Sequence, residues 1–158
     1  MKTHHTKPII NAAQHGFSLV EVLIALAVLS IGLLGLAALQ TVSLKAGHDS
    51  YQRTQATMLA YDMVDRMRAN PLALAAGKYN TVAVGTNPGS TDCVSTSCTT
   101  DQLADYDIRS WHSILAAKLS QGQGAITTVT SAGVSTRTIT VSWSENDLPI
   151  QLKLIVQL

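Results

Sequence analysis

One carboxylate stands inside the most apolar segment of this sequence. From Phe17 to Leu39 the chain offers roughly 20 apolar residues, the length a helix needs to cross a bilayer, and Glu21 is the only charged residue among them. An acid costs about 2.5 to 3.5 kcal/mol at the centre of a bilayer and less near its surface. An ionisable residue within such a segment is therefore a candidate functional residue.

The other reactive side chains do not form a catalytic set. The sequence has no Gly-rich phosphate loop, no nucleophile motif and no histidine–carboxylate spacing suited to a metal. His48 and His112 stand alone. Asp101, Asp105 and Asp107 could be read as a calcium site, but their spacing is unlike an EF-hand loop and an acid near a helix start explains the first of them. We expect no enzyme activity, cofactor or metal.

The two cysteines, Cys93 and Cys98, have four residues between them in a Ser- and Thr-rich stretch. This spacing differs from the redox motif Cys-x-x-Cys, and two cysteines without nearby histidines make a poor zinc site. In a chain exported to an oxidising compartment such a pair closes. We expect a disulfide that pins a loop, because chain entropy for so small a ring contributes only about 2 kcal/mol.

Length and charge limit the remaining functions. A chain of 158 residues is enough for one modest domain beyond a membrane anchor. Charged residues make up 13% of it and the formal net charge is +1. A nucleic-acid-binding surface requires a basic stripe, so we expect no nucleic-acid partner.

The run Gly16-Phe17-Ser18-Leu19-Val20-Glu21 resembles the processing site of type IV pilins and pseudopilins. The resemblance implies that a prepilin peptidase cuts after Gly16, methylates the new amino terminus at Phe17 and leaves the apolar segment attached. Residues 1–16 are then a leader, and Glu21 is the fifth residue of the mature chain. The resemblance also places the leader in the cytoplasm and residues 40–158 in the periplasm, as a single-pass protein of the bacterial inner membrane.

A mature terminus at Phe17 gives Glu21 a partner. The ammonium group lies one helical turn before the carboxylate, and the positive end of the helix dipole also favours an anion there. The ammonium of a neighbouring subunit could neutralise it as well. A desolvated, unpaired charge costs several kcal/mol, so we hypothesise that Glu21 sets the axial register of subunits in a filament. The simpler interpretation is an acid tolerated at the membrane surface.

A secretory signal peptide is a second interpretation of the same segment. Gly35-Leu36-Ala37 imitates a small-residue cleavage site, which would release a chain that begins at Ala38. Glu21 and the long segment before the site fit this interpretation poorly. Within the segment, Gly32 and Gly35 either soften the helix or provide close packing between helices, and the sequence leaves both open.

Helical periodicity continues beyond the apolar segment. Residues 17–39 form the expected transmembrane half of one helix and residues 40–70 its periplasmic half. Leu59, Met63 and Met67 recur at a spacing of four, as one helix face requires. Proline disfavours a helical residue before it, so Asn70-Pro71 ends the helix. Ion pairs at i, i+4 are expected between Asp49 and Arg53 and between Asp62 and Arg66.

The last part of the chain predicts a small α+β head. Residues 71–100 are rich in Gly, Ser, Thr and Asn, which is typical of a long surface loop. Residues 101–158 begin with a short helix, whose start resembles a capping box at Thr99 and Gln102. Residues 125–130, 138–143 and 150–156 show the alternation of half-buried strands, with a hairpin turn at 145–147. We expect an antiparallel sheet that packs on Leu59, Met63 and Met67, with Trp111 and Trp143 in the core.

Two further segments, Tyr61–Pro71 and Leu29–Leu36, resemble the type IV pilus modification proteins, a group of minor pilins. This resemblance implies a type IV pilin-like fold and a role in pilus biogenesis, priming or tip assembly, in twitching motility and in adhesion. The implied partners are prepilin peptidase, other minor pilins, the major pilin, the inner-membrane assembly platform and a pilus-tip adhesin. Two alternatives remain open: a pseudopilin of type II secretion, and a membrane-anchored enzyme or binding protein exported by a pilin-like leader.

Overall fold

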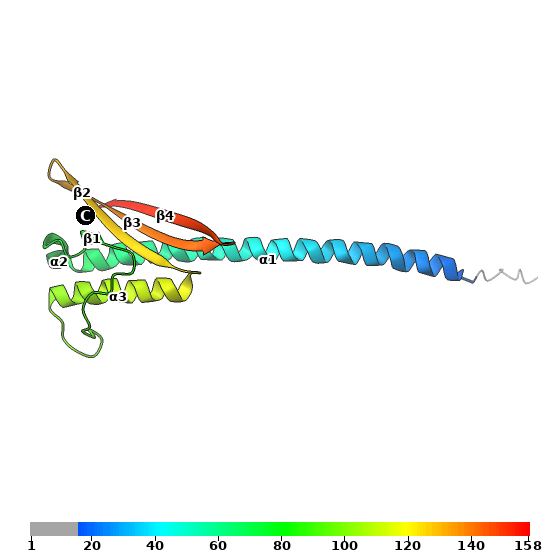
Figure 1. Cartoon of the computed structure of the whole chain (residues 1–158), viewed down its shortest axis with the longest axis horizontal. Helices are drawn as coiled ribbons and strands as arrows, with labels where there is room; N and C mark the ends of the chain where they lie inside the picture. Colours follow the sequence, from blue (N-terminus) through cyan, green and yellow to red (C-terminus); the bar gives the residue numbers. More distant parts are fainter. Residues whose placement is uncertain (1–15) are drawn as a thin grey trace, which may run out of the picture. The chain divides into compact units, whose positions relative to one another are not determined.

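The computed structural model describes residues 16–158, so the expectations for residues 1–15 of the leader lie outside the described residues. It contains three helices and four strands (Figure 1). They are α1 (Leu19–Ala69), α2 (Pro71–Ala75), β1 (Thr81–Val82), α3 (Thr100–Lys118), β2 (Gln123–Ser131), β3 (Val134–Glu145) and β4 (Leu148–Gln157). The chain divides into two compact units between Leu44 and Lys45, and α1 contributes to both.

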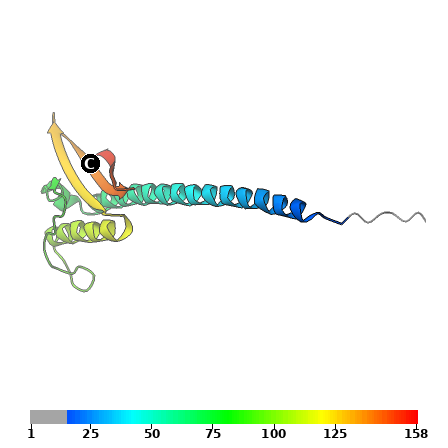
Figure 2. The same ribbon diagram turned by 45° about the vertical axis from the view of Figure 1, so that its right-hand side comes forward.

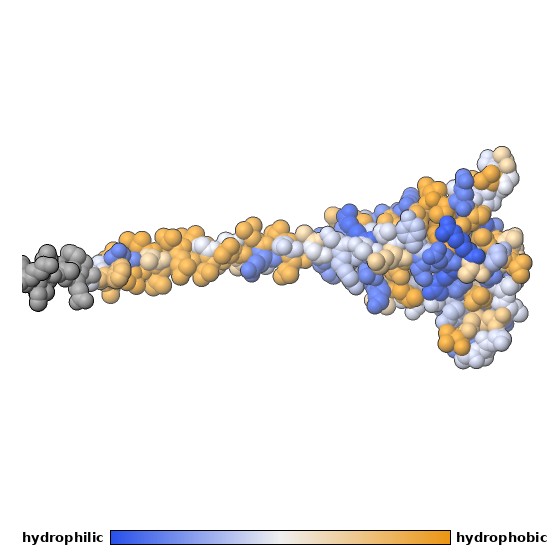
Figure 3. Space-filling view, turned by 180° about the vertical axis from the view of Figure 1, so that it is seen from behind, coloured by the Kyte–Doolittle hydropathy of each residue, from blue (hydrophilic) through white to orange (hydrophobic). Residues whose placement is uncertain are grey.

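In the first unit, α1 is exposed along its whole length up to Leu44. Figure 3 shows that apolar side chains cover most of the visible face of this part of the helix. The helix is long and apolar enough to cross a membrane. It remains helical through Gly32 and Gly35.

In the second unit, Lys45–Leu158, which we call the head, α1 is amphipathic. Its buried residues follow one another at intervals of one to four positions: Gln52, Ala56, Leu59, Ala60, Met63, Val64 and Met67. These residues form one face of a helix. The predicted packing of Leu59, Met63 and Met67 is confirmed, because all three belong to the same hydrophobic core as the buried strand residues Ile126 and Ile139.

Helix α3 lies beside the C-terminal part of α1 in both ribbon views (Figures 1 and 2). Its start is the capping box expected from Thr99 and Gln102, in which side chain and backbone of each residue bond reciprocally. Trp111 is fully buried, and its indole Nε1 donates to the Leu59 carbonyl of α1 at 2.9 Å. This bond satisfies the one polar atom that the buried indole carries.

The four strands form one antiparallel sheet in the order β1-β2-β3-β4. Buried and half-buried residues alternate along β3 from Arg137 onward. Its buried residues Ile139, Val141 and Trp143 belong to the hydrophobic core that also contains residues of α1 and α3. The expected turn between β3 and β4 is formed by Asn146 and Asp147, both with positive φ, a conformation these two residue types tolerate. The predicted α+β fold, a long N-terminal helix packed on a small antiparallel sheet, is confirmed and has the form of a type IV pilin.

The expectation that residues 71–100 are entirely loop is wrong in two places. Pro71 ends α1 as expected but also begins α2, where its missing N–H is not needed and the Asn70 side chain caps the Ala73 N–H. Thr81 and Val82 then pair with Thr127 and Ile126, which adds β1 to the sheet. Segments of five and two residues are too short to show a period in the sequence.

Gly124 of β2 permits a close approach between α3 and the sheet. A Cβ atom at this position would overlap the Trp111 ring and the Leu115 side chain of α3. Because both side chains are fully buried, neither has space to withdraw.

We therefore expect Gly124→Ala to destabilise the head by about 1–3 kcal/mol, the usual cost of overpacking a core. The measurement is chemical unfolding of the purified full chain in detergent, followed by tryptophan fluorescence. Gly133→Ala, in the turn between β2 and β3, is the control: no atom lies within 4 Å of its Cβ position, although its positive φ of 79° adds some strain. Equal loss in both variants would contradict this packing.

Candidate functional site

The proposed processing site lies at the start of α1. Gly16, Phe17 and Ser18 precede the helix, which begins at Leu19, two residues later than expected from the sequence. The Val22 N–H donates to the Ser18 carbonyl at 3.2 Å, so this carbonyl accepts the first bond of the helix. Phe17 is 84% exposed, and Glu21 lies in the first helical turn. The positive end of the helix dipole therefore acts on the Glu21 carboxylate.

A second group of charged residues joins α1 to the β3–β4 hairpin. Arg53 donates two hydrogen bonds to Glu145, from Nε to Oε1 at 3.1 Å and from Nη2 to Oε2 at 2.9 Å. The indole Nε1 of Trp143 donates to the same Oε1 at 3.0 Å. The hydrogen bonds from Arg53 hold the pKa of Glu145 below its usual value, against the opposing effect of burial. The expectation that Arg53 pairs with Asp49 is wrong, because the guanidinium forms its two hydrogen bonds with Glu145 instead.

A buried polar cluster lies near the C-terminal end of α1. Asp107 accepts from the Tyr79 hydroxyl at 2.8 Å and from Arg66 Nη1 at 3.3 Å. Arg66 also donates to Asp62 at 2.8 Å, which confirms that predicted pair. Burial is the largest cause that raises the pKa of Tyr79, and the neighbouring Asp107 carboxylate adds to it. This cluster connects α1, the loop before β1 and α3.

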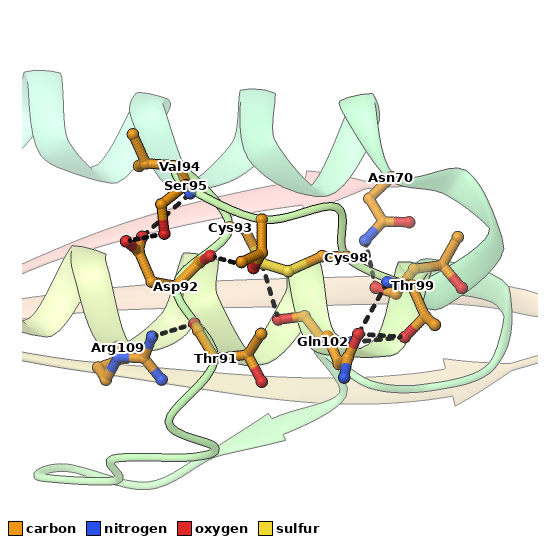
Figure 4. The surroundings of a disulfide bond; sticks show 12 residues. Asn70, Thr91, Asp92, Cys93, Val94, Ser95, Cys98, Thr99, Gln102 and Arg109 are labelled. Carbon is orange, nitrogen blue, oxygen red and sulfur yellow. Dashed lines mark hydrogen bonds between the residues drawn. A yellow bond between two sulfur atoms is a disulfide. The ribbon is translucent and has the colours of Figure 1, made fainter.

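The cysteine loop is tied to α3 (Figure 4). Cys93 and Cys98 form a disulfide with their Cα atoms 5.5 Å apart. Arg109 of α3 donates to the carbonyls of Thr91 at 2.6 Å and Pro88 at 3.2 Å. Val94, in the same loop, is 80% exposed. The loop is thus anchored at its base and presents its outer residues to solvent.

The remaining candidate residues are engaged in structural contacts. Asp101 pairs with Lys78 at 2.7 Å, and Asp107 belongs to the buried cluster, so the two acids face different partners. No group of three or more metal-ligating side chains gathers among residues 16–158. A surface cleft of about 420 Å³ is lined in part by Arg109 and His112. Both side chains have partners within the head: Nδ1 of His112 lies 2.6 Å from the Thr86 carbonyl, and Arg109 donates to the cysteine loop.

Comparison with protein families gives two adjoining matches. Residues 11–37 match the family described as the prokaryotic N-terminal methylation motif, and residues 38–109 match the family described as type IV pilin Tt1218. Both support a type IV pilin. No curated protein and no solved structure matches the chain significantly.

Together, the two matches imply processing by prepilin peptidase, assembly with pilus components and anchoring in a membrane. Type IV pilins are structural, non-enzymatic proteins. The two matches meet between residues 37 and 38, so the methylation motif covers α1 as far as residue 37, and the pilin family covers the rest of α1 and the first half of α3.

The contact of Arg53 with Glu145 predicts that the stability of the head depends on pH in the acid range. A carboxyl whose pKa is lowered by folding adds stability above its unfolded pKa, near 4.3, and this contribution is lost as the pH falls through the folded value. Glu145→Gln removes the titrating group and one charge of the pair. We expect the variant to unfold several degrees lower than wild type at pH 7 and the difference to shrink below about pH 4.

The measurement is the thermal midpoint of the full chain in detergent between pH 7 and pH 3. Asp147→Asn is the matched control, because Asp147 is an exposed acid two residues away in the β3–β4 turn. A difference between Glu145→Gln and wild type that stays constant over the whole range would exclude the ionised pair as its source.

Proposed function

We propose that this chain is a minor type IV pilin, of the group that the type IV pilus modification protein PilV represents, and that it acts in pilus biogenesis as a priming or tip subunit. The observation that carries the proposal is the combination of Gly16, Phe17 and Glu21 at the start of an exposed apolar helix. In this proposal prepilin peptidase cuts after Gly16 and methylates Phe17. The pilin is held in the inner membrane with its head in the periplasm until it enters the pilus.

Glu21 is the residue that selects the position of a subunit. It is the one charged residue of the apolar segment 17–39, so a subunit that docks with this carboxylate unpaired leaves a charge in an apolar environment. That costs several kcal/mol, whereas pairing with the ammonium of Phe17 or of a neighbour removes the cost. Among staggered parallel helices only certain axial positions provide such a pairing.

The head supports a role in recognition. Its charged clusters bind its own elements together, and the disulfide restrains a loop whose outer residues are exposed. We propose that the sheet and this loop contact the other minor pilins, the major pilin, the inner-membrane assembly platform and a tip adhesin. Twitching motility and adhesion would depend on these contacts.

A pseudopilin of type II secretion is the second candidate, because it shares the anchor and its charge. The two roles differ in the machine that the subunit serves. Loss of surface pili and twitching with normal protein secretion after deletion of the gene supports the pilus; the reverse result supports the secretion system.

Processing can be tested directly on protein purified from native membranes. Cleavage after Gly16 gives a mature chain that begins with methylated Phe17 and retains the whole apolar helix. Intact-mass and N-terminal peptide mass spectrometry measure this. A terminus at Ala38 identifies a secretory signal instead, and a functional protein that retains residues 1–16 contradicts the proposal.

Glu21→Ala tests the register hypothesis. In a strain that lacks the chromosomal gene, we expect the variant to be processed and to accumulate in the membrane, but to enter sheared pili at less than about a tenth of the wild-type level. Without the carboxylate, the ammonium of Phe17 is left unpaired in an apolar environment, and a penalty above about 1.4 kcal/mol is more than tenfold. The measurement is the ratio of the subunit in pili to that in membranes. Ser30→Ala is the matched control, because Ser30 is the next polar residue of the same helix and bonds only its own turn. Wild-type incorporation of Glu21→Ala would refute the register role.

A further inference from the structure

Strand β4 is a long free edge of the sheet. It pairs with β3 in one unbroken register from Leu148 to Gln157, and it is the last strand in the sheet order. In an antiparallel strand, every second residue directs its N–H and C=O groups away from the existing partner. A row of backbone donors and acceptors therefore faces outward along ten residues, on the side opposite β3.

The hydrophobic core is incomplete along the same edge. The inward-facing residues of β3, such as Ile139 and Val141, are fully buried, whereas their partners on β4, Leu154 and Leu152, are only half-buried. Further along β4, Val156 also packs against the core and is half-buried. One more strand beside β4 would cover these side chains and remove apolar surface from water, which is favourable in proportion to its area.

The outer face of the edge carries one charge. Lys153 lies in the middle of β4, is exposed, and has no acidic side chain of the described residues within ion-pair distance. An edge lysine normally opposes unwanted pairing, and it opposes pairing with a like charge most. A second copy of β4 aligned around this residue would place two lysines side by side, so the charge favours a different, acidic strand.

We propose that β4 is a docking edge for an extended segment of a different protein, which adds antiparallel to β4 as a fifth strand. This segment carries an acidic residue opposite Lys153. It carries apolar residues opposite Leu152 and Leu154, because those positions face the half-covered core. Main-chain bonds supply affinity in such strand addition, and alternate side chains supply specificity.

The experiment uses the full chain in detergent micelles and one synthetic peptide, acetyl-Val-Thr-Ile-Glu-Ile-Thr-Val-amide, which places its glutamate opposite Lys153 in antiparallel register. Anisotropy of the labelled peptide measures binding, and amide hydrogen exchange measures protection of β4. The control peptide has proline at both threonine positions and cannot form the ladder. A third peptide has lysine in place of glutamate.

We expect saturable binding of the glutamate peptide, no binding of the proline peptide, and slower exchange at alternate amides of β4. We expect Lys153→Glu to weaken binding of the glutamate peptide by about fivefold and to favour the lysine peptide, since a cross-strand pair of opposite charges is stabilising and a pair of like charges is destabilising. Lys118→Glu, the same change at an exposed site on α3, leaves both affinities unchanged.

Three results would overturn the proposal: absence of saturable binding, binding without protection of β4, and affinities indifferent to the charge at residue 153. Protection of β4 that increases with protein concentration in the absence of peptide would assign the edge to a second copy and would also overturn it. None of these results bears on processing at Gly16 or on pilus assembly, so the inference and the proposed function can fail separately.

Discussion

The first half of helix α1 presents apolar side chains to its surroundings on every side, and the rest of the molecule depends on how that surface is removed from water. Leu23, Ile31 and Leu39 are each between 58% and 72% exposed. Burying one such side chain contributes about 1.5–3 kcal/mol. Sixteen large apolar residues up to Leu44 are exposed in this way, so the segment requires lipid or neighbouring helices around it. In either environment Glu21 is the exception, because the same absence of water that stabilises its neighbours makes an unpaired carboxylate costly.

The second half of the same helix meets a different constraint. From Gln52 onward, one face of the helix is buried in the head and the other is exposed. This part of the helix is stabilised by tertiary packing of its buried face. The bidentate pair of Arg53 with Glu145 lies at the beginning of this face and fixes the β3–β4 hairpin to the helix. Arg66 and Asp107 do the same for α3 near the helix end. One helix therefore serves as an apolar anchor and as the central element of a polar-surfaced head.

Strong periodicity made most of this fold predictable from the sequence. The spacing of Leu59, Met63 and Met67, the capping box at Thr99 and the alternation along β3 and β4 each repeat over several residues, so single departures do not hide them. The short elements α2 and β1 contain no repeated pattern, so the sequence does not predict them. The i, i+4 rule pairs Arg53 with Asp49 because it considers only local partners. Glu145 lies 92 positions away, and only the folded register of β3 brings it near.

Internal pairing occupies most of the less exposed acids of the head, and no group of three or more metal-ligating side chains gathers among the described residues. Asp62, Asp107 and Glu145 each accept hydrogen bonds from a guanidinium, and Asp101 pairs with Lys78, so these carboxylates are already neutralised within the head. The exposed residues of strands β2 to β4 are mainly Thr, Ser and Gln with a few apolar residues such as Val129 and Ile155, and Lys153 is the one exposed charge among them. For the strand addition proposed at β4, main-chain groups at the edge would supply affinity, and Lys153 would favour a strand with an acidic residue opposite it.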